Sequence, residues 1–135
     1  MSFDQQIEAF LASDPFAVVG ASPNRAKYGN KVLRSYLQNQ RNAYPVHPTA
    51  NVIENQKVFP NLAALPESVH GVSVVTPPHV TEQVVEQVGQ MGIGHLWLQP
   101  GAESARAIER SKQLGINIIA GGPCLLVVLG YRDSL

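Results

Sequence analysis

The stretch FAVVGASPNRAKYGNKVLRSYL, residues 16–37, decides the fold that this chain is expected to adopt. It opens with four apolar residues that end at Gly20, a pattern typical of a strand buried on both faces. A polar loop then runs from Ala21 to about Tyr28. Beyond the loop, apolar residues recur at helical spacing and predict a helix with one side toward the sheet: Val32, Leu33, Tyr36 and Leu37. The stretch therefore predicts a strand, a loop and a helix, in that order.

The same alternation of strand and helix continues through the rest of the chain. Short apolar runs predict four further strands, at residues 42–46, 71–75, 95–98 and 116–120. Helical spacing predicts helices before Asp14-Pro15, after Pro77-Pro78 and over residues 104–114, with a short one near residues 62–65. Such alternation requires parallel strands joined by right-handed crossovers. We therefore expect an α/β fold, a Rossmann-like, doubly wound, mostly parallel five-stranded sheet in three α/β/α layers.

The composition indicates one domain over residues 1–135, with residues 1–14 forming a helix packed on it. Lys plus Arg and Asp plus Glu both number 10, so no overall positive field would hold a nucleic acid or an anionic membrane. The N-terminus lacks the pattern of a signal peptide, and no apolar run approaches the roughly 20 residues that span a bilayer. We expect a cytoplasmic protein without an internal disulfide, because Cys124 is its one cysteine.

A ligand of such a sheet is expected outside the carboxyl ends of the strands, where the strand order reverses. Gly20 follows the first strand directly, and Ser22 and a helix come next, so main-chain N–H groups and a positive helix end could cradle a phosphate. The alternative is an ordinary tight turn in which glycine only permits the backbone angles. Arg25 favours the phosphate cradle, whereas Lys27 and Lys31 fit either a phosphate site or a solvated basic face.

A nicotinamide dinucleotide site is the main competitor. Its fingerprint places glycines where this chain has Gly20, Ser22 and Arg25, so only the first position fits. It also needs an acid at the end of the second strand for the ribose hydroxyls, and this chain has no acid there before Glu54. A standard NAD site is therefore disfavoured.

Five short motifs occur in an order that resembles a known family: VVGASPNRAKYGNKVLRSYL, YPVHP, FPNLAALPESV, VVTPPH and LWLQPGAES. Their order is similar to that in the small bacterial and archaeal CoA-binding domain proteins, which are themselves similar to the N-terminal domain of the succinyl-CoA synthetase α-subunit. The resemblance runs from about Phe16 to Cys124. It implies a fold that binds coenzyme A or an acyl-CoA.

The resemblance also implies which residues contact the cofactor. The residues that would lie along the CoA phosphates are Gly20, Ala21, Ser22 and Arg25, continued by Tyr28 and Gly29. The residues that would wall the adenosine or the pantetheine are His47, Pro48, Thr76, Pro77 and Pro78. The residues that would border the thiol end are Gln99, Pro100 and Gly101. An apolar trough beside phosphate donors suits a CoA, which requires no acid at the second strand.

No catalytic or metal site is expected. The four histidines, at positions 47, 70, 79 and 95, are scattered without accompanying acids, so we interpret them as loop or surface residues rather than metal ligands. Cys124 is interpreted as a small buried hydrophobe, with a reactive thiol as the alternative. We expect a non-catalytic carrier, sensor or accessory module, with or without a homodimer or protein partner. The alternatives are a nicotinamide-dependent or acyl-CoA-transforming enzyme that uses the same site, and an interaction domain without ligand.

Overall fold

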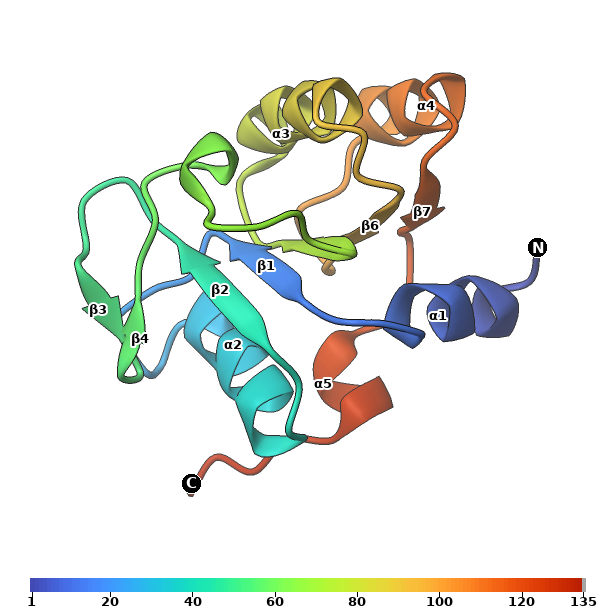
Figure 1. The fold of residues 1–135 in the computed structure, drawn as a ribbon. Coiled ribbons are helices and arrows are strands. Elements are labelled where there is room, and N and C mark those ends of the chain that lie inside the picture. The colour runs from blue at the N-terminus through green and yellow to red at the C-terminus, as the bar shows by residue number, and fades with distance from the viewer. Residues whose placement is uncertain (135) are drawn as a thin grey trace.

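The computed structural model, which describes residues 1–134, contains a five-stranded, all-parallel sheet (Figure 1). Its strands are β1 (Phe16–Val19), β2 (Ala43–Val46), β5 (Gly71–Val74), β6 (His95–Leu98) and β7 (Asn117–Ile119). They lie in the order β2-β1-β5-β6-β7. The five predicted strands and their parallel direction are confirmed, and their bounds differ from the prediction by a residue at most.

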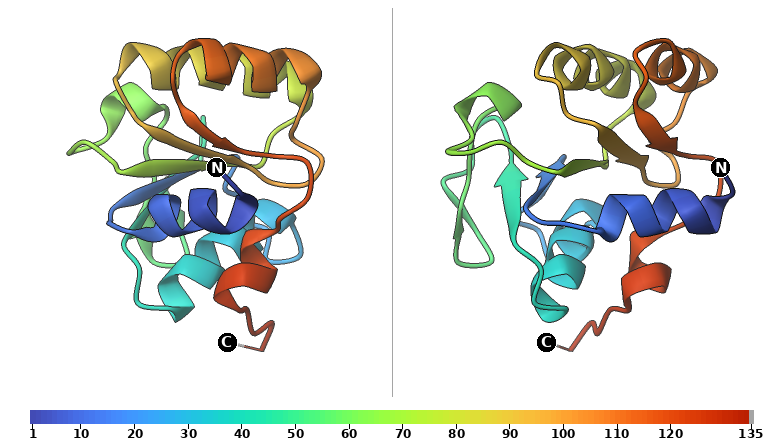
Figure 2. Two further views of the ribbon diagram at one scale, coloured as in Figure 1. Left: turned by 90° about the vertical axis from the view of Figure 1, so that its right-hand side faces the viewer. Right: turned by 45° about the vertical axis from the view of Figure 1, so that its right-hand side comes forward.

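Helices cover both faces of the sheet, which confirms the three layers (Figures 1 and 2). One face carries α3 (Pro78–Gln90) and α4 (Ala105–Gln113). The other carries α1 (Phe3–Leu11), α2 (Tyr28–Gln38) and α5 (Leu125–Leu129). Helix α5 was not predicted, because a run of five apolar residues shows no periodicity that distinguishes a helix from a strand.

The core lies in two layers because each central strand is buried on both sides. Along β1, Phe16 and Val18 belong to the cluster under α1, α2 and α5, whereas Ala17 belongs to the cluster under α3 and α4. All three are fully buried. This alternation explains why the strand is a continuous apolar run in the sequence.

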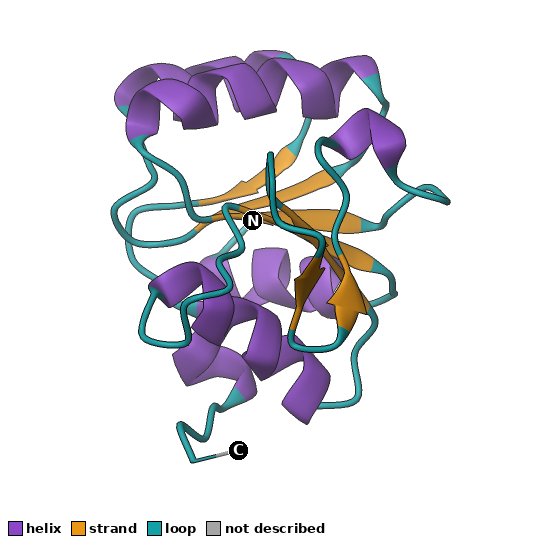
Figure 3. Ribbon diagram, turned by 90° about the vertical axis from the view of Figure 1, so that its left-hand side faces the viewer, coloured by secondary structure: helices purple, strands orange, loops and turns teal. Residues whose placement is uncertain are grey.

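A small hairpin, β3 (Val52–Ile53) and β4 (Gln56–Lys57), stands outside the main sheet and was not predicted (Figure 3). Glu54 and Asn55 form its turn with positive φ angles of 49° and 63°. After the hairpin, Phe59 makes one parallel bridge to Val46 at the free edge of β2. The segment then enters a 3-10 helix at Leu62–Ala64, close to the predicted short helix. The chain thereby returns to the carboxyl end of β2.

Candidate functional site at the carboxyl edge

The loop from β1 to α2 begins at Gly20, where both the backbone and the surroundings require glycine. Its φ of 92° lies in the left-handed region, and a Cβ there would overlap the carbonyl oxygen of Val75. Gly29, in the first turn of α2, is equally confined, because a Cβ on it would overlap the carbonyl oxygen of Gly20. The two glycines therefore let the end of β1, the start of α2 and the end of β5 meet backbone to backbone.

The first turn of α2 offers main-chain donors beside this contact. N–H groups in the first turn of a helix have no acceptor within the helix, and the helix dipole makes that end positive. The N-cap residue, Lys27, makes no capping hydrogen bond with its side chain. The β1–α2 loop thus has the chemistry of an anion site.

A buried amide that was not predicted from the sequence holds this loop from its inner side. Asn30 is fully buried, and its Nδ2 donates to the carbonyl oxygen of Ser22 at 2.9 Å and to Glu54 Oε2 at 3.2 Å. Its Oδ1 accepts from Arg34 Nε at 2.7 Å, and the Arg34 guanidinium also donates to the carbonyl oxygen of Arg25 at 2.7 Å. Asn30 and Arg34 lie four positions apart, on the same side of α2. Two polar residues at this spacing were the feature of the sequence that could have indicated the hydrogen bond between them.

Acidic groups from distant segments pair with Arg25 of the loop and with Lys31 of α2. Arg25 Nε lies 3.3 Å from Glu54 Oε2, and the Arg25 side chain is 53% exposed. Lys31 Nζ lies 3.8 Å from Asp133 Oδ1. An anion that binds at the loop would therefore contact Arg25 while the same guanidinium forms an ion pair with Glu54.

Two hollows flank the loop at the point where the strand order reverses, between β1 and β5. The first, of about 250 Å³, includes Gly20, His47, Pro48 and Thr76 in a mainly apolar lining. The second, of about 310 Å³, includes Tyr28, Thr76, Pro77, Pro100 and Gly101. Thr76 lines both, so the hollows adjoin each other along the edge of the sheet.

A hydrogen-bonded group lies behind the second hollow. The Tyr28 hydroxyl donates to Gln99 Oε1 at 3.3 Å and also contacts Cys124 Sγ. Burial, together with the hydrogen bond to Cys124, raises the pKa of Tyr28, so the phenol stays protonated at neutral pH. Gln99 is fully buried, and its Oε1 also accepts from the Leu125 N–H at 2.9 Å. Its Nε2 is buried without a hydrogen-bond partner among residues 1–134.

The structure brings most of the predicted site residues to one edge of the sheet, but these residues are not equally exposed. Those that line a hollow are Gly20, Tyr28, His47, Pro48, Thr76, Pro77, Pro100 and Gly101. Ser22 and Arg25 lie on the partly exposed part of the loop, and Pro78 is an exposed residue that begins α3. Those that are buried are Ala21, Gly29 and Gln99. Cys124 is only partly buried, and it begins α5 as its N-cap.

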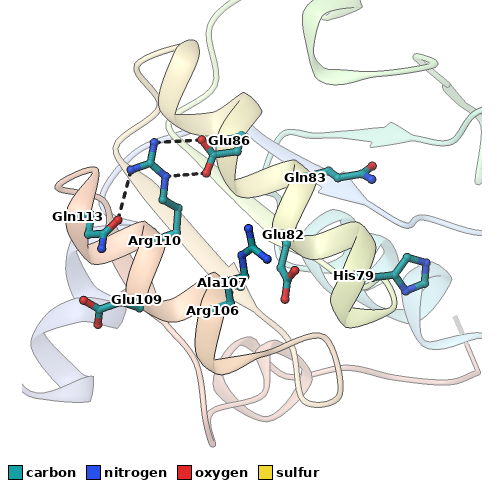
Figure 4. Close-up of a pocket in the computed structure, with 9 residues that line it drawn as sticks. All are labelled: His79, Glu82, Gln83, Glu86, Arg106, Ala107, Glu109, Arg110 and Gln113. Carbon is teal, nitrogen blue, oxygen red and sulfur yellow. Dashed lines mark hydrogen bonds and ion pairs between the residues drawn. The ribbon is translucent and has the colours of Figure 1, made fainter.

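A larger hollow, of about 750 Å³, lies between the outer sides of α3 and α4 (Figure 4). Charged and amide side chains line it, and Arg110 forms a two-pronged ion pair with Glu86, with N–O distances of 2.7 and 3.1 Å. The hydrogen bond from Arg110 holds the pKa of Glu86 below its usual value. This surface is formed by the outer sides of two helices rather than by the loops that follow the strands, and Arg110 and Glu86 neutralise each other there, so we do not regard it as the cofactor site.

The histidines occupy different environments. His47 Nδ1 accepts the N–H groups of Thr49 and Ala50 at 3.1 and 2.9 Å, and His79 is exposed on α3. His70 lies in the loop before β5, as expected, whereas His95 is the first residue of β6; both are partly buried, and their rings stack at the opposite, amino edge of the sheet. Over residues 1–134, no three His, Cys, Asp or Glu side chains are close enough to hold a metal ion. No helix in that range has the length and apolar character needed to cross a membrane.

Comparison with known protein families identifies a match over most of the chain. The family described as "CoA binding domain" matches residues 14–130. The ADP-forming acetate–CoA ligase II of Archaeoglobus fulgidus is 29% identical over 130 residues, which cover 87% of this chain and 19% of that protein. The α-subunit of ADP-forming acetate–CoA ligase I of Pyrococcus furiosus is 24% identical over 139 residues, covering 91% and 30%. The chain thus spans less than a third of the length of these curated relatives.

Solved structures share the fold. A conserved hypothetical protein from Pyrococcus furiosus superposes with a TM-score of 0.80 at 35% identity, covering 86% of this chain and 99% of that one. The dinucleotide-forming acetyl-coenzyme A synthetase 1 of Ca. Korarchaeum cryptofilum, in its apo form, superposes with a TM-score of 0.68 at 23% identity, covering 76% and 25%. The fold therefore occurs both in chains of this size and as part of larger proteins.

Proposed function

This chain belongs to the CoA-binding domain family, and from that premise we propose that it binds coenzyme A or an acyl-CoA at the carboxyl edge of its sheet. The ligand's phosphates lie along the β1–α2 loop, against the first turn of α2 and Arg25. The adenosine and the pantetheine arm occupy the two hollows that adjoin at Thr76. The role is that of a non-catalytic carrier, sensor or accessory module.

The observation that carries this proposal is that two hollows adjoin at Thr76 and that one is lined by Gly20 and the other by Tyr28, the residues at the two ends of the β1–α2 loop. CoA has charged phosphates between two less polar parts, and this edge has donors between two hollows with apolar walls. The ends of β1 and β5 fix the loop rigidly through Gly20 and Gly29, so little conformational entropy is lost when a phosphate binds.

The family match does not favour the nicotinamide alternative. The end of β2 supports the same conclusion, because His47 and Pro48 stand where a dinucleotide site needs an acid for the ribose. Glu54 comes later in the chain, and its carboxylate is engaged by Arg25 and Asn30.

Calorimetric titration with CoA, dephospho-CoA and NAD tests the proposal. We expect CoA to bind most tightly and Arg25→Ala to weaken CoA binding about tenfold, the effect of losing one charge-assisted hydrogen bond in a partly exposed site. Arg106→Ala is the matched control, because Arg106 is exposed on α4 outside the proposed site. Equal affinity for all three compounds, or no binding of any of them, would refute the proposal.

A further inference from the structure

A pair of stacked histidines lies at the amino edge of the sheet, opposite the proposed cofactor site. The rings of His70, just before β5, and His95, the first residue of β6, are 4.3 Å apart between centroids and 30° from parallel. Both lie beside α1. His70 Nε2 is 2.9 Å from the carbonyl oxygen of Ala9, and the His95 ring meets the Phe10 ring edge-on at 6.4 Å. The pair is therefore part of the surface on which α1 rests.

Asn117, the first residue of β7, connects His95 to α1. Its Nδ2 is 3.0 Å from the carbonyl oxygen of Gln6 and 3.0 Å from His95 Nδ1. The nitrogen must face Gln6, because the opposite amide orientation would set two acceptor oxygens against each other. The two amide hydrogens are then both donated, and His95 Nδ1 is the acceptor of a neutral ring. Asn117 Oδ1 is left buried with no hydrogen-bond partner in residues 1–134.

Protonation of His95 conflicts with this arrangement. Its Nδ1 would become a donor that faces the donating Nδ2 of Asn117. Rotation of the amide would offer Oδ1 to His95, but it would remove the hydrogen bond to Gln6 and oppose two carbonyl oxygens. Without rotation the hydrogen bond between His95 and Asn117 is lost, and with rotation the contact between Asn117 of β7 and Gln6 of α1 is lost. By contrast, His70 already donates from Nε2 to Ala9, and that bond survives protonation at Nδ1.

Burial, and then the neighbouring His70, favour a neutral His95. Both lower the pKa of its ring, His70 through the charge that it can carry. Asp14, which interacts with His70, forms an ion pair with Arg41 at 2.8 Å. The pKa of His95 is lower in the folded protein than its unfolded value of 6.5. The stability that neutral His95 contributes is therefore complete above pH 6.5 and decreases as the pH falls below 6.5.

We propose that His95 and Asn117 form a pH-dependent latch that holds α1 on β7, and that protonation of His95 releases α1 while the five strands stay paired. The second hydrogen bond between α1 and β7, from Gln6 Nε2 to the carbonyl oxygen of Ile118 at 2.8 Å, is then exposed to water. Release uncovers the aromatic surface that α1 protects. Phe10 is fully buried there, with its ring 5.3 Å from that of Trp97.

Hydrogen exchange of the unmodified protein tests the latch. Between pH 7.5 and 5, after correction for intrinsic exchange, we expect the α1 amides to exchange about tenfold faster, on the order of the effect of losing one hydrogen bond that holds the helix. The amides of β1 and β5 should keep their protection. Simultaneous loss of protection in α1 and the strands would overturn the proposal.

Two substitutions assign the effect to His95. His95→Gln keeps an acceptor for Asn117 but cannot take up a proton, so the pH dependence of α1 exchange should vanish. His79→Gln, at an exposed histidine of α3, should leave it unchanged. A His95→Gln protein with the wild-type pH profile would refute the latch. If that variant does not fold, His70→Gln is informative, because loss of the neighbouring charge should move the transition to higher pH and an unmoved transition contradicts the proposal.

Discussion

Gly20→Ala is expected to abolish cofactor binding and to lower the free energy of unfolding by about 3 kcal/mol, through left-handed backbone strain and overpacking together. The φ of Gly20 is 92°, and the added Cβ would overlap the carbonyl oxygen of Val75. The ends of β1 and β5 cannot move apart without breaking the backbone hydrogen bonds that pair the two strands. The loop would therefore move away from the first turn of α2, where the phosphate donors are.

Urea denaturation and titration with CoA measure the two effects. Gly94→Ala is the control, since Gly94 has no atom within 4 Å of an added Cβ and no positive φ. A Gly20→Ala protein with the stability and the CoA affinity of the wild type would show that the close approach of the two strand ends is not required.

Phe10→Ala is expected to cost about 3–5 kcal/mol of unfolding free energy, the usual loss when a buried aromatic side chain is truncated. The Phe10 ring is fully buried, stacks on Phe16 at 5.2 Å and meets Trp97 edge-on at 5.3 Å. It also fills the space beside Gly71, where an added Cβ would lie 2.8 Å from the ring. Its removal leaves a cavity between α1 and the sheet.

Chemical denaturation followed by circular dichroism measures this loss. Phe3→Ala is a matched control in the same helix, because Phe3 is 47% exposed and should change stability by less than about 1 kcal/mol. A loss for Phe10→Ala no larger than that for Phe3→Ala would mean that α1 adds little to the stability of the sheet.

The fold could be predicted because its signals are local. A strand buried on both faces is a continuous apolar run, as in Phe16–Val19, and a helix that covers a sheet shows one apolar side, as in α2. The elements that were missed lack such signals. The β3–β4 hairpin has two residues per strand, and α5 is five apolar residues long. The cofactor residues, in contrast, stay predictions that binding measurements must decide.

The sequence by itself determined the alternation of strands and helices, the glycine at the end of β1 and the lack of an acid after β2, because each depends on residues a few positions apart. Only the tertiary structure decided which distant groups meet. Asn30 reaches Glu54 across 24 residues, Tyr28 reaches Cys124 across 96, and Gln6 reaches Ile118 across 112. Such contacts depend on strand order and register, which bring residues together irrespective of their spacing in the chain. For that reason the histidines at positions 70 and 95, which look scattered in the sequence, stack where β5 and β6 begin side by side.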